Sequence, residues 1–347
     1  MKHVDRSALI AESVIAAALL SVVFLHQGAL SQPSDSGSFD VTASGRQLNI
    51  GAGETLMLTT AMAAPATEVI VIKDMSGAVV RKLLEKKRPA GRHRDAWDGK
   101  GEGGRRLPDG QYRWVATFDG GRQRATIDHS GKLDGDVESK SHPEYGPWNP
   151  FDNVPLRFSH TFEKPGEILL IFSQATHRVS PSCDPPTYFC RQMDGFQPAG
   201  EFTYEWAGVD DTGAFRPDIH AISVISNHEN LAKNAIVVYG SRPTVTGVAV
   251  SPTYFRPDLG VQEVSFSLRT YRNEHVSATV SFTNQESRSV LRTLRLADVA
   301  PGLMKASWDG RSDATTLVAP GGYTVTVWVT DSLGQRARGE ILTRADY

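Results

Sequence analysis

The sequence contains little cysteine and almost no net charge. Only two of its 347 residues are cysteines, Cys183 and Cys190, and they do not fit a paired Cys-x-x-Cys zinc pattern. The formal net charge of −2 provides no general attraction for nucleic acid, and none is expected as a partner. Hydrophobic residues make up 40% and charged residues 22% of the chain, which is typical of globular domains. The length favours two or three such domains.

Long hydrophobic runs are lacking beyond the N-terminus. Lys2 and Arg6 precede the apolar run Ser13–Leu25, and the small residues Ala29–Ser31 follow at the spacing that signal peptidases prefer. Residues 1–32 are therefore predicted to be a secretory signal peptide, with an uncleaved membrane anchor as the alternative. In both cases the rest of the chain is expected to be extracytoplasmic, that is periplasmic, cell-surface or secreted. Any membrane contact would be made through the anchor alone.

Motifs typical of enzymes are also lacking. The chain contains neither His-Glu-x-x-His nor Gly-x-Ser-x-Gly. Asp98, Asp210 and Asp211 lie in turn-forming sequence and are predicted to be turn residues rather than calcium ligands. We therefore expect no catalytic residue, no metal site, no cofactor and no enzymatic activity. A hydrolase with an unrecognised site is the alternative that this leaves open.

One short motif is present three times. The stretches "PAGRHRDAW", "PAGEFTYEW" and "APGLMKASW" each place a glycine six residues before a tryptophan, namely Trp97, Trp206 and Trp308. A proline follows each tryptophan by eleven or twelve residues. Three matching registers predict three related structural units.

Each unit is predicted to be an antiparallel β-sandwich. Short β-branched stretches such as Glu68–Asp74 and Glu167–Ser173 are typical of strands, and alternating runs follow the Pro-Gly turns at Tyr112 and Tyr323. No segment after the N-terminus has a sustained helical period. The expected fold class is all-β, with tandem Ig-like sandwiches and an N-terminal signal or anchor helix.

The repeat also sets the expected domain limits and cores. The predicted domains are residues 33–130, residues 142–241 with a cysteine-containing insertion, and residues 244–347. Trp97, Trp206, Trp308, Tyr112 and Tyr323 are predicted to lie in the cores, because an indole or phenol ring can fill the space between two sheets.

The third unit resembles a known family. The stretch "VTGVAVSPTYFRPDLGVQEVSFSL", Val245–Leu268, with the "VLRTL", "APG", "WDG" and "PGGY" elements that follow it, is similar to the flagellar hook-capping (FlgD-type) immunoglobulin-like domain. The first unit resembles it from Glu68 to Asp119, and the second only loosely. The resemblance implies an extracytoplasmic β-sandwich module. It does not imply hook capping, because a helical N-terminal region of the kind a hook-cap protein would add is not found.

An insertion in the second unit is the first candidate contact surface. It contains Cys183 and Cys190, which are expected to form a disulfide outside the cytoplasm. Tyr188, Phe189 and Met193 are the candidate partner-binding residues, since aromatic side chains on a constrained loop suit recognition. The alternative is a loop that folds onto its own domain.

A basic run is the second candidate surface. Between Arg81 and Arg94 the chain has seven Lys or Arg residues and one Glu. An anionic envelope polymer or an acidic partner could bind there, and a solvated hairpin rim is the alternative. The candidate residues are Arg81, Lys82, Lys86, Lys87, Arg88 and Arg92.

These patterns favour a structural or interaction protein of a bacterial envelope or surface assembly, with other envelope or surface proteins as partners. A module that binds glycan or another envelope polymer is the alternative from a different class.

Overall fold

The computed structural model describes residues 39–121, 124–141, 148, 149, 152, 154–174 and 188–347. These residues belong to one unit of the chain and form six β-sheets, which confirms the all-β class. Within them the only helices are two single 3-10 turns, η1 (Glu102–Gly104) and η2 (Tyr271–Asn273). None of their helices is long and apolar enough to cross a membrane. The predicted signal or anchor, residues 1–32, lies outside the described residues.

The first sandwich packs a three-stranded sheet against a six-stranded one. Its strands are β1 (Phe39–Ala43), β2 (Gln47–Asn49), β3 (Leu56–Met62), β4 (Ala66–Lys73), β5 (Val79–Arg88), β6 (Gly91–Trp97), β7 (Gly110–Asp119), β8 (Arg124–Ile127) and β15 (Ala235–Tyr239). The strand orders are β1-β3-β6 and β2-β15-β7-β4-β5, with β8 also paired to β7. Strands β3 and β4 alternate buried and half-buried residues, so one face of each sheet supplies the core.

The third sandwich has the same arrangement. Its strands are β16 (Thr244–Ser251), β17 (Tyr254–Phe255), β18 (Gln262–Arg269), β19 (Val276–Asn284), β20 (Val290–Val299), β21 (Gly302–Trp308), β22 (Gly321–Thr330) and β23 (Arg336–Ala345). The orders are β16-β18-β21 and β17-β23-β22-β19-β20. The short β17 runs parallel to β23, as β2 runs parallel to β15.

The second sandwich is built from fewer described strands. They are β9 (Val137–Ser141), β10 (Leu156–Phe162), β11 (Gly166–Ser173), β12 (Tyr188–Gln197), β13 (Gly200–Trp206) and β14 (Ala221–Asn227). The described sheets are β10-β13 and β12-β11-β14-β9. Its first strand, β9, pairs antiparallel with β14, as the last strand of the third sandwich, β23, pairs with β22.

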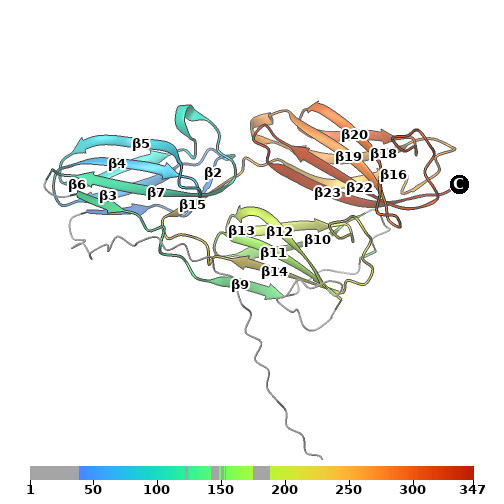
Figure 1. The fold of residues 1–347 in the computed structure, drawn as a ribbon, viewed down its shortest axis with the longest axis horizontal. Coiled ribbons are helices and arrows are strands. Elements are labelled where there is room, and N and C mark those ends of the chain that lie inside the picture. Colours follow the sequence, from blue (N-terminus) through green and yellow to red (C-terminus); the bar gives the residue numbers. More distant parts are fainter. Residues whose placement is uncertain (1–38, 122–123, 142–147, 150–151, 153, 175–187) are drawn as a thin grey trace, which may run out of the picture. The chain divides into compact units, whose positions relative to one another are not determined.

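The second sandwich is inserted into the first, so these two domains are not in tandem. Although β15 follows the second sandwich in sequence, it pairs antiparallel with β7 and parallel with β2 (Figure 1). The insertion starts after β8 and ends before β15. This corrects the expected domain limits, because residues 235–239 belong to the first sandwich and β9 begins before residue 142.

Strands β8 and β15 are two halves of one strand. In the third sandwich β23 pairs with β22 over its whole length. In the first, β15 pairs with Gly110–Arg113 of β7 and β8 pairs with Ala116–Asp119. At the interruption Asn234 replaces the missing strand residues. Its carbonyl oxygen accepts a hydrogen bond from the Trp114 amide at 3.4 Å, and its Nδ2 donates to the Trp114 carbonyl oxygen at 2.6 Å.

The three repeated tryptophans lie in the three cores. Trp97, Trp206 and Trp308 are 1%, 2% and 1% exposed. Each indole Nε1 donates to a backbone carbonyl oxygen three residues further along, so the polar atom of the buried ring is satisfied. These acceptors are the oxygens of Lys100 at 2.9 Å, Val209 at 2.8 Å and Arg311 at 2.9 Å.

Tyr112 and Tyr323 occupy equivalent positions beside two of these tryptophans. The ring of Tyr112 meets that of Trp97 edge-on, and the ring of Tyr323 meets that of Trp308 in the same way. Each hydroxyl donates to the carbonyl oxygen four residues earlier, at 2.8 Å and 2.5 Å. This contact resembles the tyrosine corner of Ig-like sandwiches and fixes the chain where it enters the strand.

Replacing a repeated tryptophan should destabilise its own sandwich. Trp97→Ala or Trp308→Ala is expected to lower the free energy of unfolding by about 3–5 kcal/mol, because a cavity replaces the indole. Denaturant melts monitored by tryptophan fluorescence would measure this. Trp328→Ala, at a position on β22 that is 37% exposed, is the control and should cost much less. Melts unchanged from those of the parent would contradict the core role.

The inserted sandwich should be removable. Replacing residues 128–234 with the dipeptide Glu-Ile would rejoin β8 and β15 into one strand. This dipeptide is taken from Glu340 and Ile341 of β23, the uninterrupted strand of the third sandwich. We expect this variant to unfold cooperatively. A chain that ends at Ser130 should not, because β7 would lose its partner over Gly110–Arg113. Circular dichroism and urea titration of the two shortened proteins provide the measurement. Cooperative unfolding of the chain that ends at Ser130, but not of the rejoined variant, would contradict the interrupted strand.

Candidate functional site

The inserted sandwich is connected to the first by a two-chain stalk, residues 128–134 and 231–234. The two chains run antiparallel, with the Asp134 amide donating to the Leu231 carbonyl oxygen at 2.9 Å and the Lys233 amide donating to the Lys132 carbonyl oxygen at 2.7 Å. The stalk is thus a short ladder rather than a pair of independent linkers.

Buried polar contacts close the base of the stalk. The fully buried Asn234 donates through Nδ2 to Asp128 Oδ1 at 3.0 Å, as well as to the Trp114 carbonyl oxygen. Burial opposes ionisation of Asp128, but hydrogen bonds from Ser130 and Asn234 outweigh it and lower the pKa of this carboxyl group. One amide side chain therefore joins both ends of the insertion to β7.

Charged and apolar contacts secure the outer part of the stalk. Arg46 pairs with Asp134 at 2.6 Å and donates to the Ala232 carbonyl oxygen at 2.5 Å. Lys164 of the inserted sandwich also reaches Asp134, at 3.2 Å. Phe196 of β12 shares a buried apolar cluster with stalk residues and β15; its other members are Leu231, Ala232, Ala235 and Val237.

Arg191 of β12 forms the main polar junction between the second and third sandwiches. Its Nε lies 2.8 Å from Asp211 Oδ1, and its Nη1 lies 2.5 Å from the Tyr204 hydroxyl and 3.5 Å from Glu340 Oε2. Arg338 pairs with the same Glu340. Burial opposes the charge of Arg191, but Tyr204 and Glu340 raise its pKa, so the guanidinium stays protonated.

Apolar and backbone contacts extend this junction. Leu342 of β23 packs in one cluster with residues that follow β13: Ala207, Val209 and Phe215. The Thr324 hydroxyl of β22 donates to the Gly213 carbonyl oxygen at 2.6 Å. Glu340, Leu342 and Thr324 lie on the outer face of their sheet, yet all three are buried.

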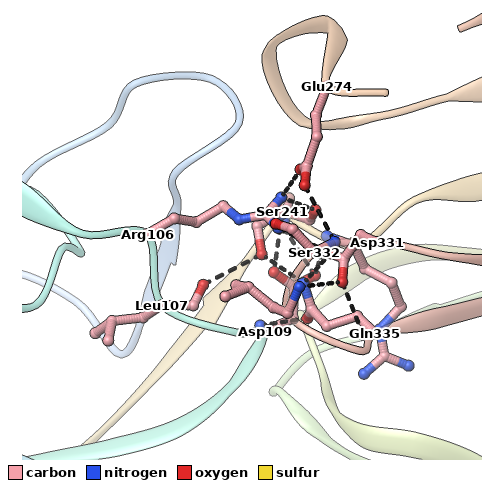
Figure 2. A network of polar contacts seen from close by, with 11 residues as sticks. Arg106, Leu107, Asp109, Ser241, Glu274, Asp331, Ser332 and Gln335 are labelled. Carbon is pink, nitrogen blue, oxygen red and sulfur yellow. Dashed lines mark hydrogen bonds and ion pairs between the residues drawn. The ribbon is translucent and has the colours of Figure 1, made fainter. Parts of the chain in front are cut away.

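A third junction joins the first sandwich directly to the third, and Figure 2 shows its polar network. Arg106 lies 2.6 Å from Glu274 and 3.1 Å from Asp331, with its guanidinium 5.1 Å from the centre of the Tyr271 ring. It also donates to the Ser241 carbonyl oxygen at 3.3 Å. One arginine of the first sandwich thus contacts two acidic side chains of the third.

Asp109 fixes the chain that connects these two sandwiches. Its carboxylate accepts hydrogen bonds from three consecutive amides, those of Gly240 at 3.1 Å, Ser241 at 2.8 Å and Arg242 at 3.2 Å. The Asp109 amide donates to Gln335 Oε1 at 2.7 Å (Figure 2). Hydrogen bonds to a charged acceptor are the stronger kind, so the segment between β15 and β16 has a defined path.

Two of the three predicted contact residues of the cysteine-containing insertion, Phe189 and Met193, pack within their own domain. Phe189 stacks on Phe172 with ring centres 4.3 Å apart, and Met193 packs against the same core. These contacts favour the alternative in which the segment folds onto its own domain. Tyr188 begins β12. Cys190 lies in β12 and Cys183 lies outside the described residues, so the disulfide stays a prediction.

Three of the six predicted basic residues contact other groups of the protein, and the other three are exposed. Arg88 is mostly buried and pairs with Asp95 at 2.6 Å and Glu68 at 3.2 Å, so its role is structural. Lys82 pairs with Glu85 at 2.9 Å, and Arg81 donates to the Gly101 carbonyl oxygen at 3.2 Å. Lys86, Lys87 and Arg92 are exposed on the neighbouring strands β5 and β6.

The turn aspartates bind backbone and side chains. Asp210 Oδ1 accepts from the amides of Thr212 and Ala214, and Asp98 Oδ1 accepts from the Lys100 amide. Across the residues that the structure describes, no group of three or more His, Cys, Asp or Glu could hold a metal ion.

The junction residues Arg106, Asp109, Arg191 and Asn234 were not predicted from the sequence. Asp109 offered one signal, since it stands in the Pro-Asp-Gly turn before β7 where the third unit has Pro-Gly-Gly. The other three gave none, because their partners lie far away in the sequence.

The described chain is thus an all-β protein of β-sandwiches, one of them inserted into another. Residues 45–121 match the model of the FlgD Ig-like domain. This match falls in the first sandwich, so the chain contains a FlgD Ig-like domain there, and the resemblance of the first unit is confirmed. For the other two sandwiches the resemblance stays a prediction. A comparison with curated proteins found no match.

Several solved structures are similar in part. A tetra-tandem repeat from the extending region of a large adhesion protein is 12% identical, with 89% of this chain and 74% of that chain covered and a TM-score of 0.23. Dimeric latent PorU from Porphyromonas gingivalis is 8% identical, with 89% and 34% covered and a TM-score of 0.26. β-Glucuronidase from Parabacteroides merdae is 11% identical, with 82% and 36% covered and a TM-score of 0.25. Scores this low carry no argument about function.

Loss of the Asp109 carboxylate should loosen the connecting segment. Asp109→Ala leaves three amides without their acceptor, and we expect a loss of about 1–3 kcal/mol in the free energy of unfolding. Hydrogen exchange at Gly240, Ser241 and Arg242 should accelerate more than exchange in the strands. Asp40→Ala, at an exposed position on β1, is the control. Unchanged exchange at the three amides would contradict the assigned contact.

Proposed function

We propose that this chain is an extracytoplasmic structural or interaction protein of an envelope or surface assembly. In this proposal the first and third sandwiches form a support, and the inserted sandwich carries the main contact surface for other envelope or surface proteins. Its role is binding rather than catalysis.

The insertion is the observation that carries this proposal. A domain inserted into a strand has both of its ends fixed, and here the base is closed by Asn234 and Asp128. The junctions at Arg191 and Arg106 add further constraints. A recognition surface on a fixed support loses less conformational freedom on binding than one on a free linker.

The sandwiches themselves support the assignment of FlgD-type repeats. The first contains the FlgD Ig-like match, and the third has the same strand orders. All three share the buried tryptophan whose Nε1 bonds a carbonyl oxygen three residues on. We propose that all three sandwiches are FlgD-type Ig-like domains.

The binding role predicts that contacts concentrate on the inserted sandwich. Photoreactive residues at exposed positions Gln192, Glu201 and Thr203 should crosslink to defined companions in cells of the source organism. The same probe at Ser267, exposed on β18 of the third sandwich, is the matched control. The variant lacking residues 128–234 should be excluded from the complex. Equal crosslinking from both sandwiches, or full incorporation of the shortened variant, would contradict the proposal.

The extracytoplasmic location is tested separately. Alkaline phosphatase fused after Tyr347 should be active in a bacterial host, because this enzyme folds only where its disulfides form. An inactive fusion at normal expression would contradict export. The same fusion to a chain that starts at Gln32 should be inactive and serves as the control.

A further inference from the structure

One edge of the first sandwich is strongly cationic. Strand β5 ends the six-stranded sheet and β6 ends the three-stranded sheet, and the short turn at Pro89 and Ala90 joins them. Both strands therefore lie at the same edge of the sandwich. We call this edge, Lys86–Arg94, the basic edge.

The acidic groups at the basic edge are already neutralised by other residues. Arg88 engages Glu68 and Asp95, and Lys82 engages Glu85. The exposed Lys86, Lys87, Arg92 and Arg94 have no such acidic partner among the described residues. The basic edge thus carries uncompensated positive charge although the protein as a whole has a net charge of −2.

The corresponding edges of the other sandwiches do not share this charge. At the β20–β21 edge, Arg292 pairs with Asp313 at 3.4 Å and Lys305 pairs with Glu263 at 2.8 Å. At the β12–β13 edge the exposed charged residues are the acidic Asp194 and Glu201. Lysines on an edge strand can also discourage strand pairing between molecules. The other two edges show that this fold does not require four uncompensated cations for that purpose.

The cations follow the direction of the strands. Arg92 and Arg94 pair with Ala61 and Thr59 of β3, which are partly exposed, so both arginines lie on the outer face of their sheet. Two residues apart on a strand, they are separated by about 6.6 Å. Lys86 and Lys87 are consecutive on β5, so they leave opposite faces of that strand and add charge on both sides of the edge. The spacing of the two arginines suits a chain of regularly repeated negative groups.

We propose that the basic edge binds a linear anionic polymer, through Lys86, Lys87, Arg92 and Arg94. Charge complementarity supports this occupant, and guanidinium groups can bind carboxylates or phosphates in bidentate fashion. The site goes beyond the proposed function and is independent of it, since it lies on the first sandwich and leaves the inserted sandwich free for protein partners.

Binding of defined polymers to the full chain tests this proposal. The probes are fluorescent polygalacturonate and polyphosphate, which distinguish carboxylate from phosphate, with neutral dextran as the uncharged control. Each titration is repeated between low and physiological salt. We expect binding to one or both polyanions, with an affinity that falls about tenfold or more over this range because counterions are released.

Two charge-matched variants make the test specific. Neutralising the basic edge with Lys86→Gln, Lys87→Gln, Arg92→Gln and Arg94→Gln should abolish most of the binding. The control neutralises four cations of the third sandwich, Arg269, Arg292, Arg295 and Lys305, and should bind like the parent chain. Circular dichroism melts verify that both variants are folded.

Three results would overturn the proposal. The parent chain fails to bind either polyanion at low salt, both variants lose affinity equally, or binding is independent of salt. Tighter binding to anionic lipid vesicles than to both polymers would also reject a polymer as the occupant. Crosslinking of the inserted sandwich is a separate measurement, so failure of one proposal leaves the other standing.

Discussion

The pairing of β15 with β7 is the contact on which the rest of the structure depends. It draws the chain back into the first sandwich after a complete second sandwich has been built. Because backbone groups buried in a sheet must be paired, the interrupted position at Trp114 has to be satisfied by something other than a strand. The Asn234 side chain does this and thereby fixes where the insertion begins and ends.

The junctions use buried charge in preference to extended apolar surface. Arg106 and Arg191 are each mostly buried and each faces more than one carboxylate. Taking such groups out of water is costly, so ion pairs of this kind add little net stability, whereas loss of one partner is strongly destabilising. Their contribution is to select one mutual arrangement of the contacting surfaces, which suits a protein whose proposed role is to hold a binding domain in place.

Local patterns were sufficient to predict the sandwich class but not the connectivity. The tryptophan spacing and the alternation in β7 and β22 depend on residues close together in sequence, so the cores around Trp97 and Trp308 could be inferred. The stretch Ala235–Tyr239 is an evident strand from its composition, yet its partner in β7 lies more than a hundred residues earlier. Nothing local distinguishes that pairing from one within the second sandwich.

The candidate contact surfaces, too, were only partly predictable from the sequence. Charge in the β5–β6 segment was visible in the sequence, but which cations stay unpaired depends on Glu68 and Asp95, whose contacts with Arg88 appear only in three dimensions. Phe189 was predicted to face a partner because of its place beside cysteines and prolines. It is half-buried and packs against the core of its own sandwich, because Phe172 on the adjacent strand offers it a stacking surface.

The interrupted strand has a consequence for the order of events during synthesis. As the polypeptide emerges from the ribosome, β14 completes the inserted sandwich at Asn227, while the enclosing one still lacks the segment that ends at Tyr239. The inserted sandwich can therefore fold first. Until β15 is available, β7 of the first sandwich lacks this partner strand over Gly110–Arg113. The inserted sandwich is therefore complete before the domain that begins upstream of it, which reverses the usual order in which domains fold during translation.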